Sequence, residues 1–165
     1  MASATRHEPV RASGWTPQEQ YVVLAHLRGL LGAALAYTGD DRQAESLVRD
    51  TLGSASARPM DVDEPGVWLH ARLWTSFQER AGGDGAGDGV ADPEPARTLG
   101  EALAALPAPS RAAVHLVDVE GLSYRQLAQV LGASTAEAAA LLHGARRRLI
   151  AAMSAGGRRP TEAAS

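Results

Sequence analysis

The stretch SYRQLAQVLGASTAEAAALLHGARRRL, residues 123–149, decides the fold. It contains two capping boxes. In the first, Ser123 is followed three residues later by Gln126, and in the second Ser134 is followed by Glu137. Each box marks a helix start, because its side chains satisfy free backbone N–H groups of the first turn. Two capped helices joined by a Gly-containing turn of about three residues predict a helix-turn-helix, which places its second helix in the DNA major groove.

Further helices are predicted before this motif. A short helix is expected to stop at Pro107, and another to begin with Ser110 as its cap and to end near Gly121. The end of the chain is rich in Gly, Arg and Pro, which favours disorder. We therefore expect a helical domain over residues 99–153 and a disordered tail over 154–165.

A second helical domain is predicted over residues 15–80, after a disordered N-terminus, 1–14. Its first helix starts at the capping box of Thr16 and ends at Gly39. Apolar residues at three- and four-residue steps are expected to face the core from this helix: Tyr21, Leu24, Leu27, Leu31 and Leu35.

Two more helices complete this predicted bundle. The second is capped by Asp40, and its apolar face consists of Ala44, Leu47, Val48, Thr51, Leu52 and Ala55. The third runs from about Pro65 to about Arg80. Because it is apolar over more than one face, we expect it to be central.

The composition changes abruptly at residues 81–98, where a run of Gly and Asp offers almost no side chain to bury. This composition predicts a flexible acidic linker. The run also suggests a calcium-binding loop, but it occurs once, and Pro95 stands where an EF-hand loop has its last Glu. The predicted fold class is thus all-α: a three-helix bundle and a helix-turn-helix domain joined by a flexible linker.

The composition excludes several classes of protein. The chain has no Cys, which removes disulfides, thiolate zinc sites and cysteine nucleophiles. Its five His share no metal-ligand spacing and no catalytic constellation is visible, so we expect no metal, no other cofactor and no enzymatic activity. No apolar run approaches ~20 residues and the N-terminus lacks the apolar core of a secretory signal, which favours a soluble cytoplasmic protein.

The formal net charge of -3 is concentrated in the predicted linker. Residues 81–98 carry four acidic residues against Arg97, a sum of -3, so the rest of the chain sums to zero. A zero balance is low for a protein that contacts DNA phosphates. DNA binding would therefore depend on local arginines rather than on the overall charge.

Five sequence blocks in the C-terminal half form one pattern, with no insertion or deletion in the spacing between them. They are Ala105-Leu106-Pro107, Arg111, Glu120-Gly121-Leu122-Ser123-Tyr124-Arg125-Gln126-Leu127-Ala128, Leu131-Gly132 and Ala145-Arg146-Arg147-Arg148-Leu149. These blocks resemble region 4 of extracytoplasmic-function sigma factors, which belong to the sigma-70 family. Residues 38–52 are similar to the polymerase-binding helix of region 2 in the same family, and Trp68-Leu69 to the start of its promoter-melting helix.

The resemblance covers most of residues 20–150 and implies a function. In such proteins region 2 binds core RNA polymerase and opens the -10 promoter element, while region 4 docks on the -35 element; an anti-sigma factor is a further partner. The implied polymerase-binding residues are Asp40, Glu45, Leu47, Val48, Arg49 and Asp50. The implied DNA-binding residues are Arg125, Ser134, Thr135, Glu137, Ala139, Ala140, His143, Arg146, Arg147 and Arg148.

The DNA-facing positions depart from the family pattern. Where the family presents Gly-Thr-Val-Lys-Ser-Arg, this chain has Ala-Glu-Ala-Ala-Ala-Leu at residues 136–141, and alanine methyl groups cannot hydrogen-bond to base edges. Two hypotheses follow. The first is a promoter-reading initiation factor, and the second is a sigma-like interaction protein that has lost promoter reading and acts through a protein such as an anti-sigma factor. A simple helix-turn-helix repressor would need a dimerisation surface, which the sequence does not show.

Several residues keep two interpretations at this point. At most two of the arginines 146–148 can face one DNA groove, and a solvated helix end is the alternative. Arg125 either contacts the DNA backbone or is merely exposed, and Glu137 either caps its helix or reads a cytosine. The charged residues of 40–50 fit a polymerase-facing surface or an ordinary polar face. The helical spacing of Trp68, Trp74 and Phe77 favours core packing over base stacking.

Overall fold

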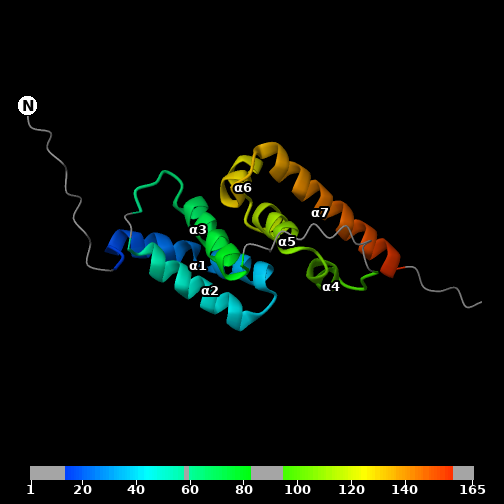
Figure 1. Cartoon of the computed structure of the whole chain (residues 1–165), viewed down its shortest axis with the longest axis horizontal. Helices are drawn as coiled ribbons and strands as arrows, with labels where there is room; N and C mark the ends of the chain where they lie inside the picture. The colour runs from blue at the N-terminus through cyan, green and yellow to red at the C-terminus, as the bar shows by residue number, and fades with distance from the viewer. Residues whose placement is uncertain (1–13, 58–59, 83–94, 158–165) are drawn as a thin grey trace, which may run out of the picture.

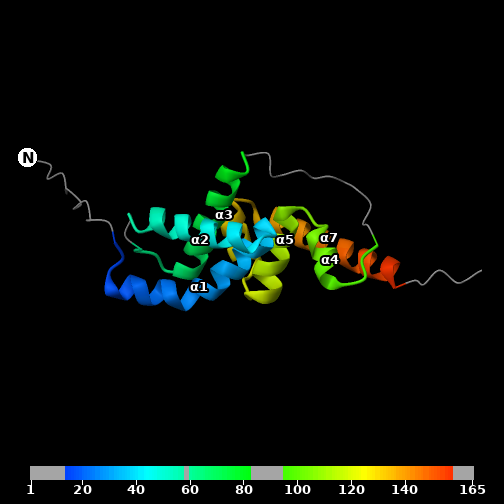
Figure 2. The same cartoon turned by 90° about the horizontal axis from the view of Figure 1, so that it is seen from below.

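The computed structural model describes residues 14–57, 60–82 and 95–157, and the predicted all-α class is confirmed within them (Figure 1). The elements are α1 (Pro17–Thr38), α2 (Asp41–Ala55), α3 (Pro65–Arg80), α4 (Leu99–Ala104), α5 (Ala108–Val114), the π-helix η1 (His115–Val119), α6 (Tyr124–Leu131) and α7 (Thr135–Gly156). Helices α1 to α3 lie at one end of an elongated molecule, and α4 lies beside α7 at the other (Figures 1 and 2).

The predicted caps are present. Thr16, Ser123 and Ser134 each form both hydrogen bonds of a capping box, and the Asp40 carboxylate accepts from the N–H of Gln43 at 2.9 Å. The prediction that Ser110 caps a helix was wrong. Ser110 lies inside α5 and is buried, because Pro107 and the prolines near it start the helix earlier.

The apolar stripe predicted on α1 was largely wrong. Tyr21 is 77% exposed and Leu24 67% exposed, and Leu31 and Leu35 are exposed as well; Leu27 packs partly against the core. The core instead receives Val23, Leu30, Ala33, Ala34 and Tyr37. Because α1 is apolar nearly all round, periodicity alone could not decide which face is buried.

Helix α1 is also long and apolar enough to cross a membrane, by length and composition only, and it is the one such helix among the described residues. His26 and Arg28 interrupt its apolar residues, so it passes this test on mean hydropathy and not as an uninterrupted apolar run of ~20 residues. Core helices of soluble proteins pass the same test, and α1 packs against α2, α3 and α5 in this structure.

One hydrophobic core extends through both halves of the chain. It joins Leu30, Leu47 and Leu73 from the first three helices to Leu116 and Leu127 from the C-terminal half. An aromatic cluster lies at its edge, where the ring centroids of Tyr37, Trp74 and Phe77 are 5.2–5.6 Å apart. Trp74 and Phe77 thus pack in or against the core, as their spacing favoured. Trp68 is partly buried against the same core, with the Arg72 guanidinium 6.0 Å from its ring centroid.

The domain boundaries stay predictions, but the ends of two predicted segments differ. The predicted linker ends in ordered chain, because Ala96 is buried and its N–H donates to the carbonyl of Ala152 at 3.1 Å. The predicted tail begins too early, because α7 continues to Gly156 and packs against this segment. Residues 1–13, 83–94 and 158–165, which hold the remainder of the predicted disordered segments and linker, lie outside the described residues.

Candidate nucleic-acid and protein interfaces

The helix-turn-helix is formed by α6 and α7. Helix α6 buries Leu127, Ala128 and Val130, and it ends at Gly132, whose φ of 67° is a left-handed conformation that suits glycine. Two residues later Ser134 caps α7. The turn is short because Gly132, the C-terminal cap of α6, and Ser134, the N-terminal cap of α7, are only two residues apart.

The residues expected to bind DNA spread around α7 and the start of α6. Those that are exposed are Arg125, Ser134, Thr135, Glu137, Ala140, His143 and Arg147, and those that are half-buried are Ala139, Arg146 and Arg148. Glu137 acts as a cap, because its carboxylate accepts from the N–H of Ser134 at 2.8 Å. Hydrogen bonds from Ser134 also lower the pKa of Glu137, so this carboxylate stays charged.

The three consecutive arginines divide between two sides of α7. Arg146 forms an ion pair with Asp118 of η1, and its Nε donates to Asp118 Oδ2 at 3.2 Å. The Asp118 carboxylate raises the pKa of Arg146, with a smaller contribution from Tyr124. Arg147 and Arg148 line a groove on the other side and have no ion pair with the described residues. Two arginines are therefore available together for phosphate contacts.

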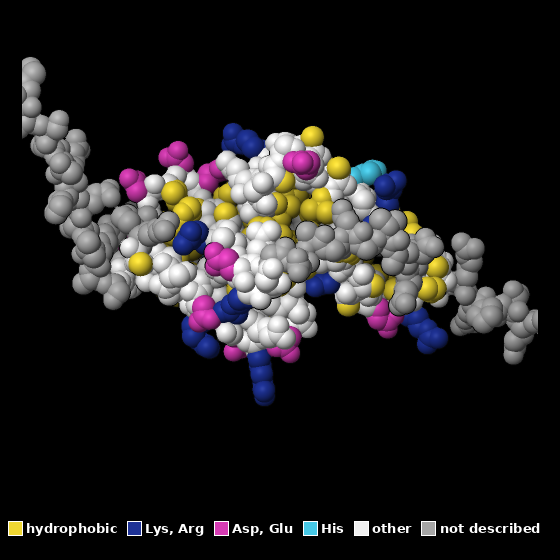
Figure 3. All heavy atoms as spheres, viewed as in Figure 1, with side chains coloured by type: hydrophobic (Ala, Val, Ile, Leu, Met, Phe, Trp, Pro, Cys, Tyr) yellow, Lys and Arg dark blue, Asp and Glu magenta, His cyan; other side chains and the backbone are white. Residues whose placement is uncertain are grey.

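The groove has a volume of about 940 Å³ and lies between the two halves of the chain. One wall is a face of α7 that contains Leu141 and Gly144 beside the two arginines, and the opposite wall includes Trp74 and Gln78 of α3. Apolar side chains gather between α3 and α7 on the face shown in Figure 3. Sequence reasoning missed this groove, because only the packing of the two halves creates it.

The surface expected to bind polymerase lies on α2 and is smaller than predicted. Asp40, Glu45, Arg49 and Asp50 are exposed, whereas Leu47 and Val48 are buried in the core. These two residues belong to the i, i+3, i+4 face that packs on α1 and α3, so they are not accessible to a partner.

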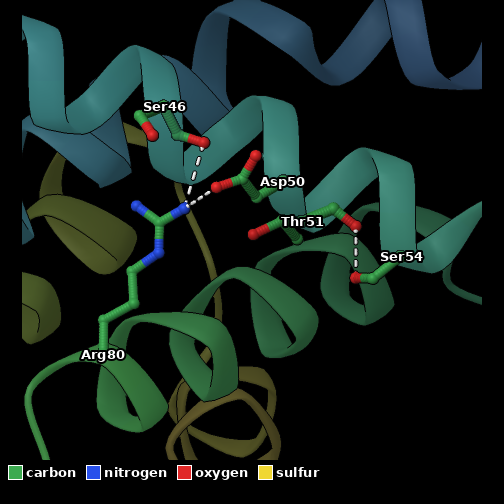
Figure 4. A network of polar contacts seen from close by, with 5 residues as sticks. All are labelled: Ser46, Asp50, Thr51, Ser54 and Arg80. Carbon is green, nitrogen blue, oxygen red and sulfur yellow. Dashed lines mark hydrogen bonds and ion pairs between the residues drawn. The ribbon is translucent and has the colours of Figure 1, made fainter.

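Asp50 is engaged within the chain. The Arg80 guanidinium at the end of α3 forms an ion pair with Asp50 and donates to the carbonyl oxygen of Ser46 at 3.2 Å (Figure 4). Helices α2 and α3 are thus joined at this end. Because the Asp40 carboxylate caps α2, Glu45 and Arg49 are the charges of this surface that have neither an ion pair nor a cap contact among the described residues.

Three histidines that are far apart in sequence meet between the two halves. His70 of α3 is buried, and burial lowers its pKa to about 4, with smaller contributions from His115 and His26. His115 of η1 has its Nε2 3.5 Å from Glu120 Oε1, and burial lowers its pKa as well. In the described part of the chain, no group of three or more His, Asp or Glu is placed to hold a metal ion. Sequence spacing gave no signal for this cluster, because its members lie on three different elements.

Comparison with known proteins gives likenesses of two kinds, to a family model and to solved structures. Residues 96–149 match the family model of sigma-70, region 4. The chain is also similar in structure to the sigma factor RpoE from Bartonella quintana, solved as a co-crystal with the anti-sigma factor NepR. The TM-score is 0.65 and the sequence identity 25%, over 81% of this chain and 95% of that chain. None of the curated proteins matches the chain in sequence.

Proposed function

We propose that this chain, whose residues 96–149 are a sigma-70 region 4 domain on the fold of an extracytoplasmic-function sigma factor, directs transcription initiation. It binds core RNA polymerase through the exposed charges of α2 and docks α7 on promoter DNA. The observation that carries the proposal is the complete helix-turn-helix, with both capping boxes formed, inside that fold. Because the polymerase and the chromosome are cytoplasmic, we place the protein there too.

The DNA contacts of this proposal rest on few cations. Arg147 and Arg148 share one face of α7 and are unpaired within the described chain, and Arg125 is exposed on α6. The N-terminal half of α7 offers mainly alanine methyl groups, which contact a thymine methyl but form no hydrogen bond. This surface predicts DNA binding that depends more on phosphate contacts than on base contacts.

A second candidate function is favoured by the groove between α3 and α7. Its walls are mainly apolar, and it lies beside the alanine-rich face of α7. The similar sigma factor was solved with an anti-sigma factor bound. A sigma-like protein that captures such a partner and no longer reads promoters would retain this groove and lose base recognition.

Reconstitution with core RNA polymerase separates the two candidates. The purified chain is mixed with core polymerase and a library of genomic fragments, and both complex formation and transcript start sites are scored. An initiation factor forms the complex and yields discrete start sites. A chain that forms no complex, or forms one without specific start sites, contradicts the first function. Retained binding to a cognate anti-sigma factor in that case supports the second.

The matched variants for this experiment lie on α2. Replacing Glu45 and Arg49 with Ala removes exposed charges and leaves the core face of α2 intact. We expect weaker polymerase binding with unchanged thermal stability. Replacing Asp41 and Arg42, which are exposed near the start of the same helix, serves as the control.

A further inference from the structure

The groove between α3 and α7 is large enough to hold a small molecule. Its volume of about 940 Å³ lies within the ~300–1,000 Å³ that is typical of ligand sites. Helix α7 forms one wall, Trp74 and Gln78 of α3 belong to the other, and α5 contributes Pro109 and Ser110. The lining is mainly apolar with a few polar groups, which is the usual composition of such a site.

The α7 wall leaves space because its side chains are small. Ala138, Gly144, Ala145 and Ala151 all line the groove. A Cβ atom on Gly144 would meet nothing within 4 Å, and Gly144 is not one of the described glycines with positive φ. Glycine is a poor helix former, so its presence inside α7 weakens the helix. Neither backbone conformation nor close packing of the described chain requires it, whereas room for a ligand does.

The charges along the groove give it a direction. Arg147 and Arg148 line it toward the C-terminal side of α7 and have no ion pair with the described residues. Glu137 lines it ten positions before Arg147, which is about 15 Å along a helix, and its carboxylate accepts from the N–H of Ser134. Leu141 lies between the two ends. The groove is therefore cationic at one end, apolar along its length and anionic at the other end.

We propose that this groove binds a small amphipathic acid, a linear apolar chain that ends in a carboxylate. The chain lies along α7 between Leu141 and Trp74, in the open space over Gly144. The carboxylate accepts hydrogen bonds from Arg147 and Arg148, because guanidinium groups present donors in the geometry that a carboxylate accepts. The arginines select an acid over a neutral or cationic head group, and the apolar walls select a chain over a hydrophilic acid.

A bound acid has a consequence for DNA binding. Arg147 and Arg148 are the two arginines that are available together for phosphate contacts, and a carboxylate on them occupies the same donors. The ligand therefore lowers the affinity of the chain for duplex DNA. This consequence rests on the proposed function, whereas the binding of the acid does not.

The first experiment uses laurate as the probe. The full chain is titrated calorimetrically with laurate below its critical micelle concentration, and we expect one laurate per chain. Dodecyltrimethylammonium has a similar apolar chain with a cationic head and is titrated in parallel. We expect it to bind at least about tenfold more weakly, because it makes no charge-assisted hydrogen bond to the arginines.

The second experiment fills the groove. Gly144→Leu places a side chain in the open space, and we expect the affinity for laurate to fall at least about tenfold. The variant should fold, because leucine is a better helix former than glycine and its Cβ meets no neighbour. Gly53→Leu in α2 is the matched control, since a Cβ there also meets nothing within 4 Å, and it should bind laurate like the original chain.

The third experiment removes the charge. Arg147→Ala with Arg148→Ala should abolish the preference for laurate over dodecyltrimethylammonium while the fold is retained. Arg28→Ala with Arg42→Ala removes the same charge from exposed positions of α1 and α2 and should keep the preference. Fluorescence anisotropy with a labelled duplex measures competition. Saturating laurate should lower the affinity for DNA in the original chain and not in Gly144→Leu.

The outcomes distinguish this site from the proposed function. A chain that binds laurate with this selectivity but binds no duplex contradicts the proposed function and leaves the site standing. Absence of laurate binding, equal binding of the two probes, or equal losses in Gly144→Leu and Gly53→Leu overturn the site. Selective binding with an unchanged affinity for DNA overturns the competition.

Two other occupants of the groove are tested in the same titrations. Replacing the four acidic residues of 83–94 with their amides raises the affinity for laurate if that segment of the chain occupies the groove. Laurate binding that weakens as the chain concentration rises indicates a second copy in the groove. Either result overturns the proposal, and an affinity independent of both changes supports it.

Discussion

Helices α1 and α7 have the same length, 22 residues, and both begin with a complete capping box, but they pack in different ways. Helix α1 is apolar nearly all round and leaves Tyr21 and Leu24 in solvent. Helix α7 buries a narrow row of small residues, Ala138, Ala145 and Ala152, together with Leu142. The comparison teaches that a cap fixes where a helix starts, while the surrounding elements decide which face is buried.

The largest expected effect is on the buried face of α1. Leu30 is 1% exposed, so Leu30→Ala should lower the free energy of unfolding by about 2–5 kcal/mol, because it leaves a cavity in the core. Leu24→Ala on the exposed face of the same helix should change it by less than about 0.5 kcal/mol. Urea unfolding followed by circular dichroism measures both. Similar losses in the two variants would show that the outer face of α1 is covered in solution.

Acid should weaken the packing around His70 of α3, which faces His26 of α1, and not the exposed surface of α7. The pKa of His70 is lowered to about 4, while an unfolded histidine titrates near 6.5, so the unfolded chain binds more protons between these values. Stability is therefore full above about pH 6.5 and falls as the pH falls toward 4, by up to about 3 kcal/mol.

The groups that face His70 are His26 and His115, and Glu120 faces His115 in turn. His70→Gln should flatten this loss in urea unfolding curves recorded from pH 7.5 to 4. His143→Gln, on the exposed surface of α7, is the control and should leave the pH dependence as it is. A profile that His70→Gln does not change would assign the acid sensitivity to other groups.

Removing the N-terminal cap of α1 or of α7 should lower the free energy of unfolding by about the same amount. Thr16→Ala and Ser134→Ala each remove a side-chain acceptor and should lower the unfolding free energy by about 1 kcal/mol. Native-state hydrogen exchange of the first-turn amides locates each loss. A Ser134→Ala variant that loses several kcal/mol would mean that the second cap supports the whole helix-turn-helix and not only the start of α7.

The smallest effect on stability is expected at the two arginines of α7 that line the groove. Arg147→Ala with Arg148→Ala should leave the unfolding free energy within about 0.5 kcal/mol of the original. If both arginines contact phosphates, the slope of log affinity for duplex DNA against log salt should flatten by up to about 1.8, at about 0.9 per contact. Arg28→Ala on the exposed face of α1 is the matched control. An unchanged slope in the double variant would remove α7 from the DNA interface.

Much of the fold followed from local signals. The capping boxes at Thr16, Ser123 and Ser134 located three helix starts, because a cap depends only on residues three apart. The faces of α2 were predicted well, since that helix has a clear polar side. The start of α5 was misplaced at Ser110, where the nearby prolines outweigh a serine cap.

The candidate site was less accessible to such reasoning. Leu47 and Val48 were taken from a family motif as contact residues, although their own periodicity had already placed them on the core face. The pairing of Arg146 with Asp118 and the meeting of His26, His70 and His115 depend on contacts between distant segments. No spacing within one helix encodes them.

The π-helix η1 changes the spacing at which residues before and after it face the same side. The N–H of Glu120, the residue directly after η1, donates to the carbonyl oxygen of His115 at 3.1 Å. This five-residue step is one residue longer than the four-residue step of an α-helix. In an α-helix, residues five apart would point about 140° away from each other; here both side chains reach α1. The π-helix therefore has the effect of a one-residue insertion. Deleting one residue from 115–119 would rotate Glu120 away from Gly29 of α1 and rotate every following residue of the helix-turn-helix relative to α1.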